Sequence, residues 1–425
     1  MTQKSKKPIY YGWWIVAGSF VLLFLFAGAG FYSFSIFIKP LEDAFGWGRA
    51  QISFAMSIYM LVHGLAAPFV GHWTEKYGPK RIMTFFAAGT GLAFITVSFT
   101  QSLWFFYAAY AFLSLTTTGI GFIPVSSLIS RWFVKKRGTA LGITMVGIAV
   151  GGMTMSPVVD AIVSRYNWRV SFIVLGILVW ILALPVTFFV LKGSPADMGL
   201  LANGKAKDEV DSPLTGSETA ATSLEEEGWP FKAAIRSKAF RWITISYILA
   251  PLAQLGVLNH QVPMITSSSG MSATAAATAL GFTAGLGGLG KLSFGRLSDI
   301  IPFHLTAAIC FGSQALGVSL LYFAHSPVMV WLHVLTFGFG MGGIVVLLPL
   351  AVGQFFGMAA FGTIMGAISL AMSMGSASGA VISGVIYDNF GSYQYALIFY
   401  VILYLSSIFT IFMAGKPKPY IVGHR

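Results

Sequence analysis

The chain alternates between long apolar segments and short polar connections along almost its whole length. A helix needs about 20 predominantly apolar residues to cross a bilayer. By this criterion we predict twelve membrane-spanning helices, at residues 12–38, 51–73, 81–101, 103–130, 138–161, 169–192, 239–265, 274–297, 303–323, 327–355, 360–387 and 393–414. We therefore expect an all-α membrane protein, and an even number of spans places both termini on the same side.

One hydrophilic segment, residues 193–238, interrupts this pattern in the middle. Its small residues and mixed charge predict a flexible cytoplasmic linker. A short surface helix before the seventh span also fits this segment. The linker divides the chain into an N-terminal six-helix bundle (1–192) and a C-terminal six-helix bundle (239–425).

Composition and charge support a membrane location. Only 9% of the 425 residues are charged, whereas soluble domains have about 25%. The net charge of +12 does not indicate nucleic-acid binding, because the basic residues lie in short loops. With the termini inside, 21 of the 26 Lys and Arg residues fall on the inner side and four on the outer side. The positive-inside rule therefore predicts that both termini are cytoplasmic.

Several classes of protein are excluded. The first apolar run is too long for a cleaved signal peptide and lacks a small-residue cleavage site, so we interpret it as a retained span. The single cysteine, Cys310, provides neither a disulfide framework nor a metal-binding spacing. No catalytic motif of a metalloprotease, P-loop enzyme or serine hydrolase is present. We expect neither an enzyme nor a bound cofactor.

Lys291 lies within the apolar segment 274–297. A charge in the middle of a membrane helix costs about 2.5–3.5 kcal/mol on insertion scales. No Asp or Glu lies well inside any apolar segment, so the anion that binds Lys291 is expected to come from a substrate. The alternative is that the long side chain extends to the cytoplasmic interface, since Lys291 lies about six residues to the cytoplasmic side of the midpoint of the span.

Two histidines are further candidates. His260 and the adjacent Asn259 lie toward the outer part of the seventh span. This histidine could bind a carboxylate or carry a proton near neutral pH, or simply form part of the polar outer rim. His63, in the second span, either lines a cavity or bonds to a neighbouring helix, and we favour the structural role.

A weak internal repeat relates the two halves. The segment Gly71–Arg81 follows span two, and Gly295–Asp299 follows span eight in the corresponding place. The first resembles the G-x-x-x-D-R-x-G-R-R loop of the major facilitator superfamily, with an acidic residue that faces basic residues and helix termini as a breakable latch. Glu75 replaces the Asp and Lys76 the first Arg. The gating residues that this resemblance implies are Gly71, Glu75, Lys76, Gly78, Lys80, Arg81 and Asp299.

A second stretch resembles the monocarboxylate transporter family. Residues 132–147 are similar to its signature Y-F-x-K-R-R-x-L-A-x-G-x-A-x-A-G, and 10–14 to its other signature. This branch includes bacterial lactate transporters and the oxalate:formate antiporter. The resemblance implies a monomeric functional unit in the plasma (inner) membrane of a bacterium, with spans 5 and 8 packed across the halves. Lys135, Lys136 and Arg137 would act in orientation and gate contacts.

The resemblance also implies a substrate site in a central cavity. Lys291 falls where relatives have an Arg that binds the substrate carboxylate, although Lys lacks the planar fork of Arg. The other cavity positions are Gly28, Phe31, Tyr32, Phe122, Met341 and Val345. Tyr32 and Gly287 replace a Lys and an Asp of the animal members, so their proton relay cannot be transferred. Met372 stands where the oxalate transporter has a second cation, which disfavours a dianion.

These features predict a secondary transporter of small organic anions. We expect symport of a monocarboxylate, lactate-like or aromatic, with protons, and the candidates for proton coupling are Lys291, His260 and His63. The expected partners are a small carboxylate, protons and the lipid bilayer. The alternatives are an obligate organic-anion exchanger and an exporter of organic acids.

Overall fold

The computed structural model describes residues 10–202 and 228–415, and the described chain contains helices and no strand. The N-terminal bundle consists of α1 (Gly12–Ala27), η1 (Gly28–Tyr32), α2 (Phe34–Phe45), α3 (Arg49–Tyr77), α4 (Pro79–Ser98), α5 (Leu103–Thr118), α6 (Phe122–Trp132), α7 (Arg137–Arg165), α8 (Trp168–Pro185) and η2 (Val186–Val190). The C-terminal bundle consists of α11 (Lys238–Ser269), α12 (Ala273–Leu297), α13 (Phe303–Tyr322), α14 (Pro327–Phe356), α15 (Phe361–Phe390) and α16 (Gln394–Met413).

The predicted spans agree closely with these helices. Eleven helical stretches of the described chain are long and apolar enough to cross a membrane, and in three of them consecutive elements form one span: α1 to α2, α5 to α6, and α8 to η2. The remaining prediction, 274–297, corresponds to α12, which is long enough but is not among the eleven. Its many glycines and Lys291 make it less hydropathic than its neighbours.

The polar connections end the helices by local hydrogen bonding. The side chains of Ser102, Asn167, Ser237 and Ser272 each accept a hydrogen bond from a backbone N–H in the first turn of the helix that follows. Such caps satisfy N–H groups that lack a partner within the helix. At the other end, Gly270 closes α11 with a φ of 68°, a conformation that favours glycine. Because these signals are local, most predicted ends lie within four residues of the helix ends, whereas the first span continues to Phe45, seven residues beyond its predicted end.

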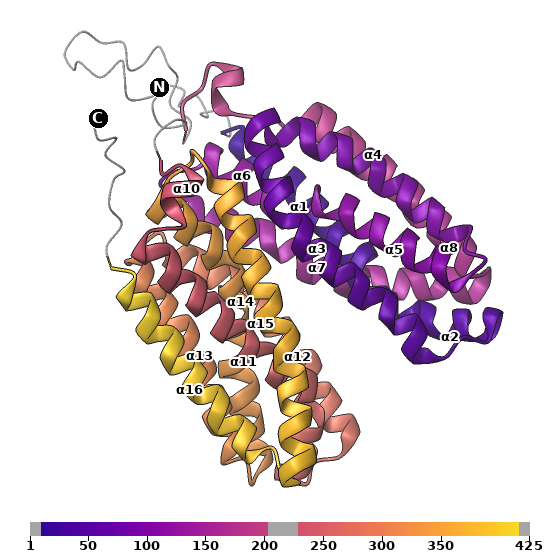
Figure 1. Cartoon of the computed structure of the whole chain (residues 1–425), viewed down its shortest axis with the longest axis vertical. Coiled ribbons are helices and arrows are strands. Elements are labelled where there is room, and N and C mark those ends of the chain that lie inside the picture. Colours follow the sequence, from indigo (N-terminus) through magenta and orange to yellow (C-terminus); the bar gives the residue numbers. More distant parts are fainter. Residues whose placement is uncertain (1–9, 203–227, 416–425) are drawn as a thin grey trace, which may run out of the picture.

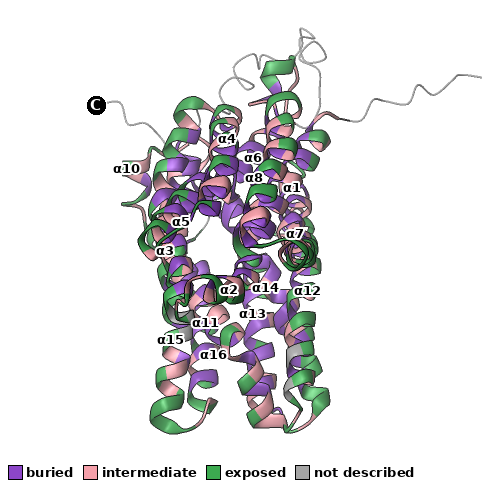
Figure 2. Ribbon diagram, turned by 90° about the vertical axis from the view of Figure 1, so that its right-hand side faces the viewer, coloured by how far each residue is buried: buried purple, intermediate pink, exposed green. Residues whose placement is uncertain are grey.

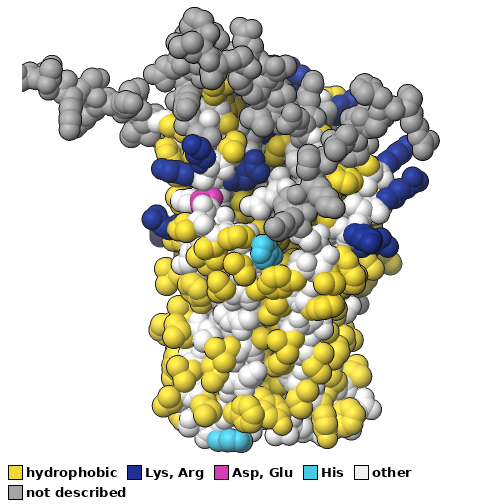
Figure 3. All heavy atoms as spheres, turned by 90° about the vertical axis from the view of Figure 1, so that its left-hand side faces the viewer, with side chains coloured by type: hydrophobic (Ala, Val, Ile, Leu, Met, Phe, Trp, Pro, Cys, Tyr) yellow, Lys and Arg dark blue, Asp and Glu magenta, His cyan; other side chains and the backbone are white. Residues whose placement is uncertain are grey.

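The two bundles meet at one end of the molecule and diverge toward the other (Figure 1). We call the end at which α1, α7 and α11 begin the proximal end, and the opposite end the distal end. Each bundle buries its own core, while exposed residues cover the outward-facing helix surfaces (Figure 2). On the face drawn in Figure 3, Lys and Arg gather toward the proximal end, and the rest of the face has many apolar side chains and no Lys or Arg. This distribution fits a protein that is embedded in a bilayer.

Two pairs of helices join the bundles at the proximal end: α7 packs against α12, and α3 packs against α15. A Cβ atom at Gly71 would lie 2.1 Å from the carbonyl oxygen of Gly362, and one at Gly138 would lie 2.1 Å from that of Gly295. Backbones can approach this closely only where side chains are small. We call these two contacts together the proximal seal.

The glycines of spans 5 and 8, which are α7 and α12, pack against different neighbouring helices. Gly142 lies on the contact between α7 and α12, whereas Gly147 packs against α1 and Gly290 against α14. Gly281 and Gly285 face open space on the distal part of α12. Helix packing therefore explains most, but not all, of these glycines.

Part of the linker is described. The N–H of Trp229 donates to the carbonyl oxygen of Phe356 at 2.8 Å, and a single helical turn, α10 (Phe231–Ala234), precedes α11. These contacts attach the end of the linker to α14. The run Glu225–Glu227 lies outside the described residues.

Candidate functional site

Lys291 is buried in α12, with 8% of its surface exposed. Its Nζ donates a long hydrogen bond of 3.4 Å to the carbonyl oxygen of Gly287, one turn toward the distal end. This direction is usual for helical side chains, which lean toward the N-terminus of their helix. Among the described residues, no Asp or Glu lies within ion-pair distance of the Nζ. The ammonium therefore points into the molecule and away from the proximal interface.

The backbone around Lys291 is held by two neighbouring helices. A Cβ at Gly142 of α7 would lie 2.7 Å from the carbonyl oxygen of Lys291, and one at Gly342 of α14 would lie 2.6 Å from its N–H nitrogen. The Cε of Met341 lies over Gly287, at 2.8 Å from the position of a Cβ there. The structure thus brings Met341 close to the ammonium, while Val345 is half-buried one turn further along α14.

His63 lines a cavity of about 100 Å³ between the bundles. Its imidazole lies between the rings of Phe26 and Tyr59, with centroid distances of 5.5 and 6.3 Å. The other lining residues are Gly64, Ala67, Thr118, Phe122, Ile123, Ser369, Met372 and Ser373. Both bundles contribute to this cavity, and it includes Phe122 and Met372, which the family resemblance assigns to the central cavity.

His260 is not brought together with Lys291. Its Nδ1 lies 3.2 Å from the hydroxyl oxygen of Tyr393, at the distal end of the C-terminal bundle. The adjacent Gln261 donates to Thr283 of α12 at 2.8 Å. Thr283 precedes Lys291 by eight residues, or about 12 Å along a helix. His260 and the exposed Asn259 therefore lie well toward the distal side of the ammonium.

Gly28, Phe31 and Tyr32 lie in the π-helical turn η1, which interrupts the first span. Gly28 is pressed against the carbonyl oxygen of Gly151, 2.6 Å from the position of a Cβ. Tyr32 packs on Gly152 and meets the ring of Phe31 edge-on. Single π-turns occur frequently at functional sites. The sequence did not predict this turn, since glycine alone does not distinguish it from an ordinary helix.

The carboxylate of Glu75 accepts two hydrogen bonds of 2.7 Å, from the N–H and the hydroxyl of Thr363. Thr363 lies in the first turn of α15, where the helix dipole favours a negative charge. The loop's basic residues do not form an ion pair with this carboxylate: Lys76 lies over the ring of Tyr77 and Lys80 over that of Phe188. We call this pair of residues the Glu75 latch.

The remaining candidate residues of this loop are Gly78 and Arg81. Gly78 has a φ of 82°, which connects α3 to α4, and Arg81 is exposed. A positive φ of this size favours glycine, so Gly78 has a conformational role.

The carboxylate of Asp299 joins α12 to α7. It accepts hydrogen bonds from the N–H of Gly138 at 2.8 Å, the N–H of Thr139 at 2.8 Å and the hydroxyl of Thr139 at 2.6 Å. These donors lie in the first turn of α7, as Thr363 does in α15. We call this group the Asp299 latch.

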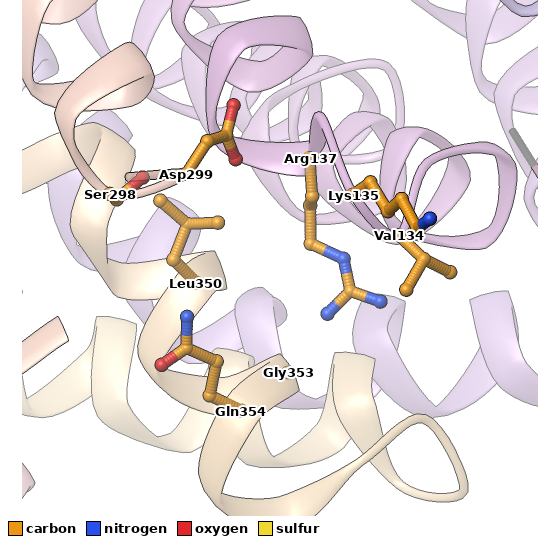
Figure 4. Close-up of a pocket in the computed structure, with 8 residues that line it drawn as sticks. All are labelled: Val134, Lys135, Arg137, Ser298, Asp299, Leu350, Gly353 and Gln354. Carbon is orange, nitrogen blue, oxygen red and sulfur yellow. The ribbon is translucent and has the colours of Figure 1, made fainter. Parts of the chain in front are cut away.

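Arg137 closes the space beside the Asp299 latch. Its guanidinium donates to the carbonyl oxygens of Phe133 and Ser130, at 3.1 and 3.2 Å, and in Figure 4 it points toward Gly353 and away from Asp299. A pocket of about 340 Å³ opens here, lined by Val134, Lys135, Arg137, Ser298, Asp299, Leu350, Gly353 and Gln354. Lys136 is exposed. The basic run thus borders the seal, but only Arg137 reaches inward.

A buried polar network was missed by the sequence analysis. Gln261 donates to Thr283 and lies 3.0 Å from Nε2 of His333, whose Nδ1 donates to the carbonyl oxygen of Gly317 at 2.8 Å. Four helices of the C-terminal bundle are joined in this way. No local pattern marks these residues, since each side chain finds its partner on a different helix.

The two stretches that resemble the monocarboxylate transporter signatures meet at the proximal end. The hydroxyl of Tyr10 donates to the carbonyl oxygen of Trp132 at 2.8 Å, and that of Tyr11 donates to Val190 at 2.8 Å. The indole of Trp132 donates to Lys192 at 3.1 Å. The N-terminal signature therefore anchors the ends of three spans within one bundle.

The sequence is similar to that of known transporters over most of its length. The family model of the Major Facilitator Superfamily matches residues 20–373. The uncharacterized MFS-type transporter YcxA of Bacillus subtilis (strain 168) is 24% identical over 390 residues, which cover 87% of this chain and 88% of the relative. Monocarboxylate transporter 13 of Rattus norvegicus is 24% identical over 389 residues, which cover 90% of this chain and 84% of the relative.

Solved structures share the fold at low identity. The MFS transporter FucP in its outward conformation matches with a TM-score of 0.71 at 12% identity and covers 94% of this chain and 98% of its own. The human organic anion transporter MFSD10 (TETRAN) matches with a TM-score of 0.69 at 14% identity and covers 95% of this chain and 100% of its own.

Proposed function

Because the chain belongs to the Major Facilitator Superfamily, whose members are transporters and not enzymes, we propose that this multi-pass membrane protein is a secondary transporter of small monocarboxylates coupled to protons. The ammonium of Lys291 carries this proposal. It is buried, points to the interior and has no acidic partner among the described residues. Leaving such a charge without a counter-ion is costly, and a carboxylate substrate would supply one.

The names of two similar proteins support an anionic substrate. A monocarboxylate transporter is similar over nearly the whole chain, and an organic anion transporter shares its fold. A single ammonium matches one carboxylate, and Met341 near Lys291 and Phe122 in the His63 cavity suit a lactate-like or aromatic acid. Gly28, Phe31, Tyr32, Val345, His260 and Asn259 remain candidate contacts along the path to Lys291.

The arrangement of the bundles suits alternating access. We place the proximal end in the cytoplasm of a bacterial cell, because the connections at that end carry most of the Lys and Arg residues. In that orientation, the proximal seal is closed on the cytoplasmic side and the bundles diverge toward the outside. A substrate would enter from the distal side, and the latches would break as the halves rock.

Carboxylate binding to purified protein tests the site. We expect Lys291→Ala to abolish binding of lactate or benzoate, and Lys291→Arg to retain it because relatives bind carboxylates with Arg. Lys39→Ala is the matched control, since it removes a positive charge that pairs with Asp43 on the distal side. Undiminished affinity in Lys291→Ala would refute the proposed site.

Transport in proteoliposomes tests the coupling. With a pH-sensitive dye inside the vesicles, proton symport predicts acidification that accompanies carboxylate uptake. Candidates for the proton-binding group are Lys291, His260 and His63, and each can be replaced in turn. Exchange of labelled for unlabelled acid without net uptake would instead identify an obligate exchanger.

A further inference from the structure

The cavity between the bundles contains two hydrogen-bonding groups that lack partners. The hydroxyl oxygen of Ser369 is buried and makes no hydrogen bond within the described chain. His63 uses only one of its ring nitrogens, Nδ1, which lies 2.8 Å from the hydroxyl oxygen of Thr118. Buried polar groups are normally paired, so an unpaired group in a cavity indicates a ligand or water.

The neighbours of His63 determine which nitrogen carries its proton. The hydroxyl of Thr118 donates its hydrogen to the carbonyl oxygen of Ser114 at 2.7 Å. With its hydrogen used in this way, the Thr118 oxygen accepts from His63, and we assign the hydrogen of the neutral imidazole to Nδ1. The Nε2 is left as an acceptor without a partner among the described residues. The cavity thus offers an acceptor on one bundle and, in the Ser369 hydroxyl, a donor on the other.

Along the length of the bundle, the Lys291 ammonium lies level with the middle of α7. Its acceptor is the carbonyl of Gly287, and the next residue, Gly288, faces Ala149 of α7. A Cβ at Gly288 would lie 3.7 Å from the Cβ of Ala149, an ordinary contact distance. The charge therefore lies at the level of Ala149.

By its contacts, His63 lies about one helical turn nearer the distal end, beside the α3–α15 contact. Two residues after Ala149, Gly151 is pressed against the carbonyl oxygen of Phe24 in α1. Two residues further along α1, the ring of Phe26 lies 5.5 Å from that of His63. Lys291 belongs to the α7–α12 contact and His63 borders the α3–α15 contact, so a ligand that reaches both must be elongated.

We propose that the cavity lined by His63 and Ser369 binds a hydroxyl group at the end of the substrate remote from its carboxylate. This proposal rests on the proposed function, because Lys291 is taken to hold the carboxylate. A hydroxyl donates to Nε2 of His63 and accepts from the Ser369 hydroxyl, so it satisfies both groups together. A methyl ether at this position can only accept a hydrogen bond, and an unsubstituted C–H can neither donate nor accept one. The cavity volume of about 100 Å³ leaves room for such a group, since one water occupies about 30 Å³ of the liquid.

Equilibrium binding of three aromatic acids to purified full-length protein tests this inference. The ligands are 4-hydroxyphenylacetate, 4-methoxyphenylacetate and phenylacetate, which differ only at the remote end. We expect wild-type protein to bind the hydroxylated acid about tenfold more tightly than phenylacetate, the size expected for two neutral hydrogen bonds. The methoxy compound should gain little.

The variants identify which groups cause the preference. Ser369→Ala should reduce it to about threefold, since one hydrogen bond is lost. His63→Phe keeps a ring between Phe26 and Tyr59 and should have a similar effect. The double variant should bind both acids alike, and Thr118 keeps its bond to Ser114 in each case.

Two outcomes would overturn the inference: wild-type protein that does not prefer the hydroxylated acid, or a preference that survives in both single variants and the double variant. Lys291→Ala separates this inference from the proposed function. It should remove measurable binding of both acids alike, whereas Lys291→Arg, which keeps the charge, should retain the ratio of their affinities. If Lys291→Ala altered neither affinity, the carboxylate site would be wrong, while the ratio would still report on the cavity.

Discussion

The two latches of the proximal seal use the same device with different strength. In each, a carboxylate at the end of one helix accepts hydrogen bonds from the first turn of a helix in the other bundle. Asp299 accepts three such bonds, whereas Glu75 accepts two from Thr363 and only a weaker interaction from the N–H of Gly362. Charge-assisted hydrogen bonds contribute about 1.5–3 kcal/mol each, and the helix N-terminus adds to them. The α7–α12 side should therefore hold the seal more firmly.

The internal repeat explains why the latches are alike. Four residues before each carboxylate stands a glycine: Gly71 before Glu75 and Gly295 before Asp299. Each glycine touches the same helix start that the carboxylate binds, at Gly362 or Gly138. The repeat is therefore a structural unit in which the glycine permits close approach and the acid caps the opposing helix.

The difference between the latches matters for transport. Lys291 lies in α12, eight residues before Asp299, which follows the end of this helix. One rigid helix therefore connects the proposed carboxylate site to the stronger latch. The α3–α15 side carries His63 and Ser369 instead. A substrate that binds on both sides would therefore contact helices of both latches.

The largest expected effect comes from adding methyl groups to the seal. Gly71→Ala combined with Gly138→Ala places two Cβ atoms about 2 Å from backbone oxygens, so the helices must separate. Overpacking costs typically 1–3 kcal/mol at each site, and every 1.4 kcal/mol shifts the ratio of closed to open seals tenfold. Spin labels at the exposed residues Arg81 and Lys238 would report the opening as an increased distance.

The matched control for this pair uses glycines outside the seal. Gly281→Ala and Gly285→Ala add the same atoms where nothing lies within 4 Å. They should leave the distance distribution unchanged. An equal shift in the control would show that the close approach at Gly71 and Gly138 is not what closes the molecule.

The sequence predicted spans that correspond to the eleven candidate membrane helices of the described chain, because a bilayer demands long apolar helices and local caps end them. It also put forward Glu75, Asp299 and Lys291 as candidates, since motif and charge mark them without a structure. It could not predict the close packing around the Lys291 backbone, which depends on Gly142 of α7 and Gly342 of α14. Nor could it identify Ser369, one serine among many, because its significance lies in a cavity shared with His63.

Removing the latch charges tests the asymmetry directly. Asp299→Asn loses the charge that three donors share, whereas Glu75→Gln loses one that two donors share. We expect the closed seal to be weakened by about 2–3 kcal/mol in the first and about 1–2 kcal/mol in the second. The same spin-label distance, or protease accessibility of the proximal face, would measure this difference. Equal shifts would mean that the number of hydrogen bonds does not determine the strength of a latch.

Removing one hydroxyl from each latch should have a smaller and more equal effect. Thr139→Val and Thr363→Val delete the hydrogen bonds of 2.6 and 2.7 Å but keep the backbone donors. Each should cost about 1–1.5 kcal/mol, near the lower range for bonds to charged groups. Thr336→Val is a suitable control, since its hydroxyl bonds only within its own helix. A much larger effect at Thr139 would place the asymmetry in the side chain and not in the backbone donors.

Shortening the acid of the weaker latch should have the smallest effect, and its direction is informative. Glu75 lies within α3, two residues before the helix ends, whereas Asp299 lies two residues beyond the end of α12. A residue inside the helix needs a longer side chain to reach the opposing bundle. Glu75→Asp should therefore weaken the latch slightly, by about 0.5–1 kcal/mol because a charged bond becomes longer, although Asp is the residue of the motif that this loop resembles. A seal that tightened in Glu75→Asp would show that the two carboxylates are positioned alike and that length does not distinguish them.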